Sequence, residues 1–153
     1  MTGCRNVGYI LSFRHPVILS RMKPDYRTYF LQGVAHFNAH EFWEAHESWE
    51  TIWLAAASDV EQFLQGMIQL AAAYHHLKRG THRGAVRLFE AALRRLAAFP
   101  QKWSGIDRRA AEAAAQRHRE RVALSSEIVP PSEFPELVLL SSDESPIPPR
   151  EEW

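Results

Sequence analysis

The chain is poor in the residues and patterns that mark several classes of protein. It has a single cysteine, Cys4, which excludes an internal disulfide framework and a cysteine-rich metal site. No apolar run approaches the roughly 18 residues that a membrane-spanning helix needs, and no segment alternates apolar and polar residues like a half-buried strand. We therefore expect a cytoplasmic, all-α protein without membrane association, and nothing in its composition indicates a cofactor.

Basic residues are missing from a long central stretch, although the formal net charge is zero. Positions 28–77 contain six acidic residues and no lysine or arginine, whereas positions 78–121 contain twelve basic residues against four acidic ones. After position 125 the chain is acidic again, with Arg150 as its one basic residue. Blocks of opposite charge pair with each other or with a partner. We favour pairing within the molecule or between subunits over nucleic-acid binding, and predict a homo-oligomer that self-associates through its acidic and basic faces.

Prolines and apolar residues divide the chain into three parts. Residues 1–24 contain short apolar pieces interrupted by Pro16 and are interpreted as a peripheral leader. The alternative is that Met1 is a mis-called start and that the chain begins at Met22, which precedes a helical pattern. Residues 25–124 are the expected helical domain. Residues 125–153 hold six of the nine prolines together with serines and acids, a composition typical of disorder. Within this tail, the apolar segment 134–140 is a candidate for docking on the helices or on a partner.

Five segments of the domain have the period of amphipathic helices. They cover residues 25–37, 41–54, 58–78, 82–98 and 108–124, which predicts a compact bundle of about five helices. Ser58 and Glu61 have the spacing of a capping box, Gly80 is suited to end the third helix, and Asp107 is suited to cap the fifth. The segment 58–78 is apolar on nearly all sides, so it should be the central helix.

A weak internal repeat relates the first two helices to the next two. Gly33 and Trp49 have counterparts in Ala73 and Phe89, each forty positions later. Each unit is a helix, a short turn and a second helix, with small residues where two antiparallel helices approach each other. The pattern is typical of tetratricopeptide-like hairpins, although its period is longer than their usual 34. Two hairpins are too few for an extended array, which favours a compact bundle.

The densest group of polar and aromatic side chains lies in residues 40–53 (HEFWEAHESWETIW). On a helical wheel, His46 falls within the apolar face of this helix and Glu50 lies on its flank. The central helix carries a polar seam, Gln65, Gln69 and His76 with Gln62 at its edge, that can meet them. An unsatisfied buried polar group costs about 1–3 kcal/mol. We favour a structural network that ties the two helices together over a ligand pocket. The side chains expected to form it are His46, Glu47, Glu50, Gln65, Gln69 and His76.

Metal binding and catalysis by these side chains are the open alternatives. The Glu-x-x-His pairs of two-carboxylate iron bundles do not occur, nor does the HExxH pattern of zinc proteases. No metal is favoured; if one binds, the geometry allows His46, Glu50 and His76 as its ligands. A general acid–base role for Glu50 or Glu47 with His46 is chemically reasonable, because burial raises the pKa of a carboxyl group toward neutrality. No serine, threonine or cysteine stands in a recognisable nucleophile motif.

The fifth helix is rich in arginine and could hold phosphates. It lacks the interleaved aromatic residues that stack on bases. We favour a solvated face, or a dock for the acidic surface of residues 41–61, over RNA binding. The basic residues concerned are Arg108, Arg109, Arg117, Arg119 and Arg121, with His118 among them.

Several blocks of the sequence together resemble a known family. They are Gly33, Phe37-Asn38, the run 42–47 with Trp49-Glu50 and Trp53, then 65–69, 72–76, Gly80, Gly84-Ala85 and Leu88. Over about residues 26–96 this combination is similar to the small bacterial and archaeal helical proteins catalogued as domain of unknown function 309. The resemblance implies an all-helical, cytoplasmic protein and supplies no catalytic residues. It also implies that the polar run and the glutamine seam belong to the family pattern.

Three hypotheses on function follow. The first is a helical binding or interaction module for an unknown protein or small molecule, with a largely structural polar cluster. The second is a small hydrolytic enzyme that uses the cluster with or without a metal. The third is an RNA-binding accessory protein acting through the basic fifth helix, which the missing aromatic residues disfavour.

Overall fold

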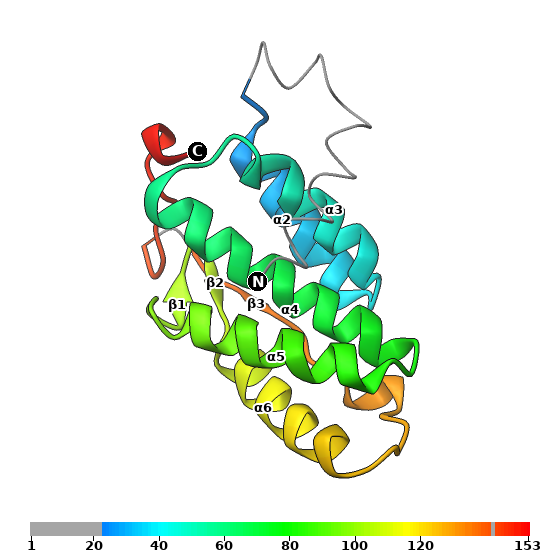
Figure 1. Ribbon diagram of the computed structural model, residues 1–153. Helices are drawn as coiled ribbons and strands as arrows, with labels where there is room; N and C mark the ends of the chain where they lie inside the picture. The colour runs from blue at the N-terminus through cyan, green and yellow to red at the C-terminus, as the bar shows by residue number, and fades with distance from the viewer. Residues whose placement is uncertain (1–22, 142) are drawn as a thin grey trace.

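The computed structural model describes residues 23–141 and 143–153, and in this range the chain forms five α-helices (Figure 1). The predicted all-α bundle is confirmed, whereas the tetratricopeptide-like geometry of its hairpins stays a prediction. Each helix packs against the next one along the chain. The helices are α2 (Tyr26–Asn38), α3 (Phe42–Trp53), α4 (Ser58–Lys78), α5 (His82–Leu96) and α6 (Arg109–Leu124).

Two predictions concern the N-terminal part of the chain. The leader, residues 1–24, lies outside the described residues except for Lys23 and Pro24. The alternative start at Met22 also lies outside them. The first helix of the described residues is α2.

The structure adds a small sheet that the sequence pattern did not indicate. Its strands are β1 (Lys102–Trp103), β2 (Ile106–Asp107) and β3 (Val138–Leu139), in the order β1-β2-β3 with antiparallel pairing throughout. Each strand has only two residues, which is too short to produce an alternating pattern. Two short 3-10 turns, η1 (Pro131–Glu133) and η2 (Arg150–Glu152), complete the described elements.

The helix ends follow the predicted signals in part. Gly80 adopts a φ of +79° just after α4, a left-handed conformation that glycine takes without strain. Asp107 lies one residue before the N-cap position of α6, which Arg108 occupies, and its Oδ1 accepts a hydrogen bond from the backbone nitrogen of Arg109 at 2.9 Å. The predicted cap at Ser58 is wrong. Ser58 is already the first residue of α4, and the N-cap position is occupied by Ala57, which has no side-chain acceptor.

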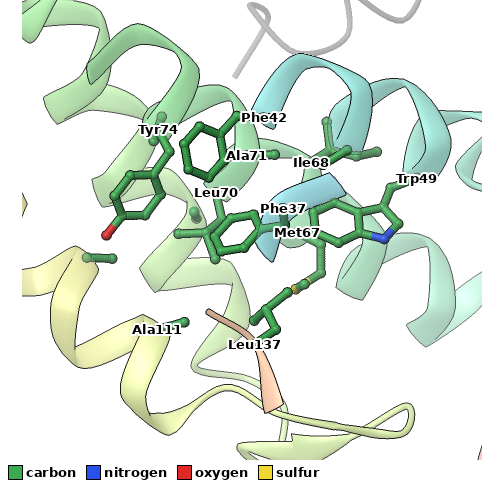
Figure 2. Close-up of a cluster of buried hydrophobic side chains, with 14 of the residues drawn as sticks. Phe37, Phe42, Trp49, Met67, Ile68, Leu70, Ala71, Tyr74, Ala111 and Leu137 are labelled. Carbon is green, nitrogen blue, oxygen red and sulfur yellow. The ribbon is translucent and has the colours of Figure 1, made fainter. Parts of the chain in front are cut away.

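Helix α4 is central, as its apolar residues predicted. It packs against both α3 and α5, and its side chains are buried along most of its length. The Tyr74 ring of α4 lies 5.9 Å from that of Phe37 in α2 and 5.3 Å from that of Phe42 in α3 (Figure 2). The same ring lies 4.9 Å from that of Phe89 in α5. Helices α2 to α5 thus share one aromatic core.

The residues after α6 fold back over the helices, which differs from the expected disordered tail. The ring of Phe134 lies 5.5 Å from that of Phe42 and 5.7 Å from that of Tyr74. Leu137 reaches the core cluster (Figure 2), and β3 pairs with β2. Composition indicated disorder because apolar residues are few in this segment. The few that are present cover an apolar surface that α3 and α4 already provide.

Asn38, at the end of α2, holds the tail through both ends of its amide. Its Nδ2 donates to the carbonyl oxygen of Leu137 at 2.9 Å, and the backbone nitrogen of Leu137 donates to its Oδ1 at 2.7 Å. We expect Asn38→Ala to lower the free energy of unfolding by about 2 kcal/mol, because each lost bond contributes about 1 kcal/mol. Hydrogen exchange of the Leu137 amide should accelerate in this variant. It should not accelerate in Val138→Ala, whose side chain is exposed. Unchanged protection in Asn38→Ala would show that other contacts hold the tail.

Candidate functional site

His46 and Glu50 lie one turn apart on α3 and are both fully buried. The Nε2 atom of His46 is 3.7 Å from Oε2 of Glu50, a distance within reach of an ion pair but too long for a hydrogen bond. Neither side-chain nitrogen of His46 nor either carboxyl oxygen of Glu50 has a hydrogen-bond partner among the residues that the structure describes. The predicted neighbours therefore meet, but they do not satisfy each other.

Trp43 lies against this pair. Its ring stacks on that of His46, with centroids 4.8 Å apart and an interplanar angle of 7°. On α4, the ring of His75 lies 5.2 Å from that of Trp43. The candidate residues included neither Trp43 nor His75. The sequence did contain a signal for the contact between Trp43 and His46. They are three residues apart, and side chains at this spacing are neighbours on a helix.

Burial shifts the pKa values of the pair in opposite directions. Desolvation, with a smaller contribution from His75, lowers the pKa of His46 to about 4. Desolvation, with a smaller contribution from Glu47, raises the pKa of Glu50 to about 7. At neutral pH the imidazole is therefore uncharged, and the carboxyl group is divided between its acid and carboxylate forms. The pair offers hydrogen-bond donors and acceptors in a dry environment without a permanent charge.

The polar seam of α4 is directed in part toward α5. The fully buried Gln69 accepts a hydrogen bond from Nε of Arg95 at 3.4 Å, and Gln62 accepts one from Nη1 of Arg95 at 2.5 Å. His76 lies next to Gly84 of α5, since a Cβ atom added at Gly84 would be 3.2 Å from its Nδ1. The seam was expected to face α3, and for that reason Arg95 was not among the candidates.

The structure brings together two of the three residues of the candidate metal set, His46 and Glu50, and places His76 against α5. Within residues 23–141 and 143–153, no three His, Cys, Asp or Glu side chains are grouped so that they could hold a metal ion. Of the other candidates, Gln65 is buried and Glu47 is half-buried. That the six residues act together as a site stays a prediction.

The arginines of α6 contact acidic residues of the same molecule. An Nη1 atom of Arg121 lies 2.7 Å from Oε1 of Glu133 in the tail. Arg119 lies 3.5 Å from Glu90 of α5. The Arg121–Glu133 contact joins the basic block to the acidic tail, whereas Glu90 belongs to the basic block itself. Both contacts leave less of this helix free for phosphates.

Arg108 has a structural role that the sequence did not reveal. Its side chain is fully buried and its Nη2 donates to the carbonyl oxygens of Leu96 and Phe99, at 3.2 and 3.3 Å. Its guanidinium carbon also lies 5.2 Å from the centre of the Phe63 ring. Carbonyl groups at a helix end lack partners within the helix, so Arg108 satisfies the end of α5. It is not exposed for phosphate binding, which corrects its place among the candidate RNA contacts.

A family model matches the central part of the chain. Its description is Domain of unknown function (DUF309), and it covers residues 30–88. Comparison with curated proteins gives no match, and neither does comparison with solved structures. Among the helices described, none is long and apolar enough to cross a membrane. The matched segment runs from α2 into α5 and includes His46, Glu50 and Gln69, but not α6 or the tail. Residues 30–88 of the chain are therefore similar to the DUF309 family.

Proposed function

We propose that this chain is a helical binding module whose recognition centre is the His46–Glu50 pair. The observation that supports the proposal is that four buried polar atoms lack a hydrogen-bond partner in the part of the chain that the structure describes. An unsatisfied buried polar group costs about 1–3 kcal/mol. A core selected for stability alone would place apolar side chains of similar volume at these positions. Retention of a destabilising pair is typical of a site that serves binding.

The chemistry of the pair indicates what it would bind. A neutral imidazole and a carboxyl group with a pKa of about 7 suit an uncharged polar group, such as an amide or a hydroxyl, on a protein or a small molecule. A fully charged ligand group would lose its hydration here without gaining a stable counter-charge. Trp43 is half-buried and stacked on His46, so displacement of its ring would open the pair to a ligand.

Native mass spectrometry of the purified full chain tests this function. We expect a non-covalently bound species in the wild type that His46→Leu and Glu50→Leu both lose. Glu44→Gln should retain it, because Glu44 is an exposed acid on the same helix. Thermal denaturation would confirm that the leucine variants fold, since replacing an unpaired polar side chain in the core should not lower stability. A wild type free of bound species, or a species that the leucine variants keep, would contradict the proposal.

We further propose that the module self-associates through its acidic and basic faces. Arg83 and Arg87 on the exposed side of α5 form no ion pair among the described residues, and Glu44 on α3 is likewise exposed. Charges left unpaired within one molecule are available to a second copy. The masses recorded in the same experiment report the oligomeric state. A monomer at all protein concentrations would overturn this part of the proposal.

A small hydrolytic enzyme is the second candidate. It is favoured by the position of Glu50, whose carboxyl group lies beside His46 and has a pKa near 7, the value suited to a general acid or base at neutral pH. In that role Glu50 would take a proton from a water molecule or give one to a leaving group. The two candidates differ in the fate of the bound species, which a binding module returns unchanged and an enzyme converts.

A further inference from the structure

The start of α4 and the end of α5 lie at the same end of the bundle, next to β1 (Figure 1). A cavity of about 390 Å³ is lined by residues of these segments. Its volume is in the range of pockets that hold small organic ligands. It includes neither His46 nor Glu50, so it is separate from the proposed recognition centre. The side chains that give it its chemistry are Asp59 and Gln62 of α4, Arg94 and Arg95 of α5, and Phe99 and Trp103 in the segment that follows.

Two arginines bring positive charge to this cavity. Arg95 is held by amide oxygens, from Gln62 at 2.5 Å and from the buried Gln69 at 3.4 Å. Amides orient a guanidinium group without neutralising it, whereas a carboxylate partner would do both. Arg94 is exposed, and neither arginine forms an ion pair with any residue that the structure describes. The two charges are therefore available to an anion.

An aromatic ring forms another part of the lining. Trp103 is half-buried, and its ring lies 4.6 Å from that of Phe63 and 5.1 Å from that of Phe99. These contacts fix its orientation while it lines the cavity. A flat ring that enters the cavity can stack on such a fixed surface, and stacking of this kind tolerates many heterocycles. Asp59 adds a hydrogen-bond acceptor for an amino or hydroxyl group.

We propose that this cavity binds a small organic anion that carries a flat heterocycle, of the nucleoside monophosphate class. The phosphate group contacts Arg94 and Arg95, whose planar guanidinium groups match the geometry of phosphate oxygens. The heterocycle lies against Trp103, and Asp59 accepts a hydrogen bond from a sugar hydroxyl or an amino group. Specificity arises from three contacts together, because the arginines, Trp103 and Asp59 each recognise a different part of the ligand.

Isothermal titration calorimetry on the full chain tests the proposal with three titrants, adenosine monophosphate, adenosine and inorganic phosphate. We expect adenosine monophosphate to bind at least about tenfold more tightly than either of the others, because only it engages both the arginines and the ring. Arg94→Gln should weaken its binding about tenfold, the loss expected when a charge-assisted contact is removed. Arg94 is exposed and forms no ion pair among the described residues, so this variant should fold normally.

The matched control is Arg87→Gln, which removes an exposed arginine from the same helix outside the cavity. Its affinity for adenosine monophosphate should equal that of the wild type, and the indole NMR signal of Trp103 should shift on titration in both. No binding of adenosine monophosphate would overturn the proposal. If inorganic phosphate bound as tightly as adenosine monophosphate, the role of the ring would be overturned. If Arg94→Gln bound adenosine monophosphate as tightly as the wild type, the assignment to this cavity would be overturned.

Discussion

Replacing Glu50 with glutamine is expected to stabilise the fold at pH 8 by about 3 kcal/mol and to change it little at pH 4. The pKa of Glu50 is about 7 in the folded protein and 4.5 for an unperturbed glutamate. Between these values the folded state keeps a proton that the unfolded state has lost. The free energy of unfolding of the wild type therefore falls as pH rises from 4.5 to 7, and it stays low above. Glutamine has no proton to lose, so this penalty disappears.

His46 contributes with the opposite sign. Its pKa is about 4 in the folded protein against 6.5 for an unperturbed histidine, so the unfolded state gains a proton first as pH falls. The contribution of His46 is present above pH 6.5 and is lost as pH falls toward 4. In the wild type the two effects oppose each other between about pH 4.5 and 6.5. In His46→Leu, the free energy of unfolding should fall as pH rises, because only the effect of Glu50 remains. In Glu50→Gln, it should increase as pH rises, because only the effect of His46 remains.

Urea denaturation from pH 4 to pH 8 measures these differences, with each variant compared to the wild type so that all other titrating groups cancel. Glu44→Gln is the matched control, because it makes the same chemical change at an exposed position of α3. Its curve should run parallel to that of the wild type. If the Glu50→Gln curve also ran parallel, the carboxyl group of Glu50 would have an ordinary pKa, and the account of the pair as neutral and desolvated would be wrong.

Gly33→Ala is the second substitution with a large expected effect, a loss of about 3 kcal/mol. A Cβ atom at this position of α2 would lie 2.1 Å from Nε1 of Trp49 and 2.5 Å from its Cδ1. Trp49 is fully buried, and its indole nitrogen donates to the carbonyl oxygen of Phe30 at 3.1 Å. The ring cannot move aside without losing this bond, worth about 1 kcal/mol. Overpacking of the core adds about 1–3 kcal/mol, partly offset by the higher helix propensity of alanine.

Gly84→Ala makes the same change in α5 and serves as the control. The nearest atom to its added Cβ would be Nδ1 of His76 at 3.2 Å, on a half-buried side chain that can shift. Because alanine is the better helix former, this variant should be neutral or more stable by up to about 1 kcal/mol. Thermal denaturation of both variants gives the comparison. Equal stabilities would mean that α2 and α3 do not approach as closely at Gly33 as the structure shows.

The helices were predictable because local signals determine them. The central position of α4 could be inferred from its apolar circumference, and a hydrogen bond from Asp107 near the start of α6 from its residue type. The tail contacts could not be inferred in this way. The amide of Asn38 binds a backbone group far along the chain, and β3 has only two residues. Such contacts depend on the assembled surface, which periodicity and composition do not describe.

The candidate site, too, could be predicted from the sequence only in part. His46 and Glu50 stand four residues apart on one helix, so their proximity follows from helix geometry. The partners of Gln69 and His76 do not follow from geometry on one helix. Helix α4 is apolar nearly all round and has neighbours on several sides, so its own pattern cannot tell whether a polar residue faces α3 or α5. Arg95 was missed because the polar residues of α4 were expected to face α3.

The docked tail has a consequence for the order of events during synthesis. Phe134 covers Phe42 and Tyr74, yet a ribosome makes both helices before it reaches the tail. At about 5–20 residues per second, this leaves an interval on the order of seconds. During that time the nascent bundle presents uncovered aromatic rings. Chaperones, or a second nascent copy of the chain, would meet these rings before the tail closes over them.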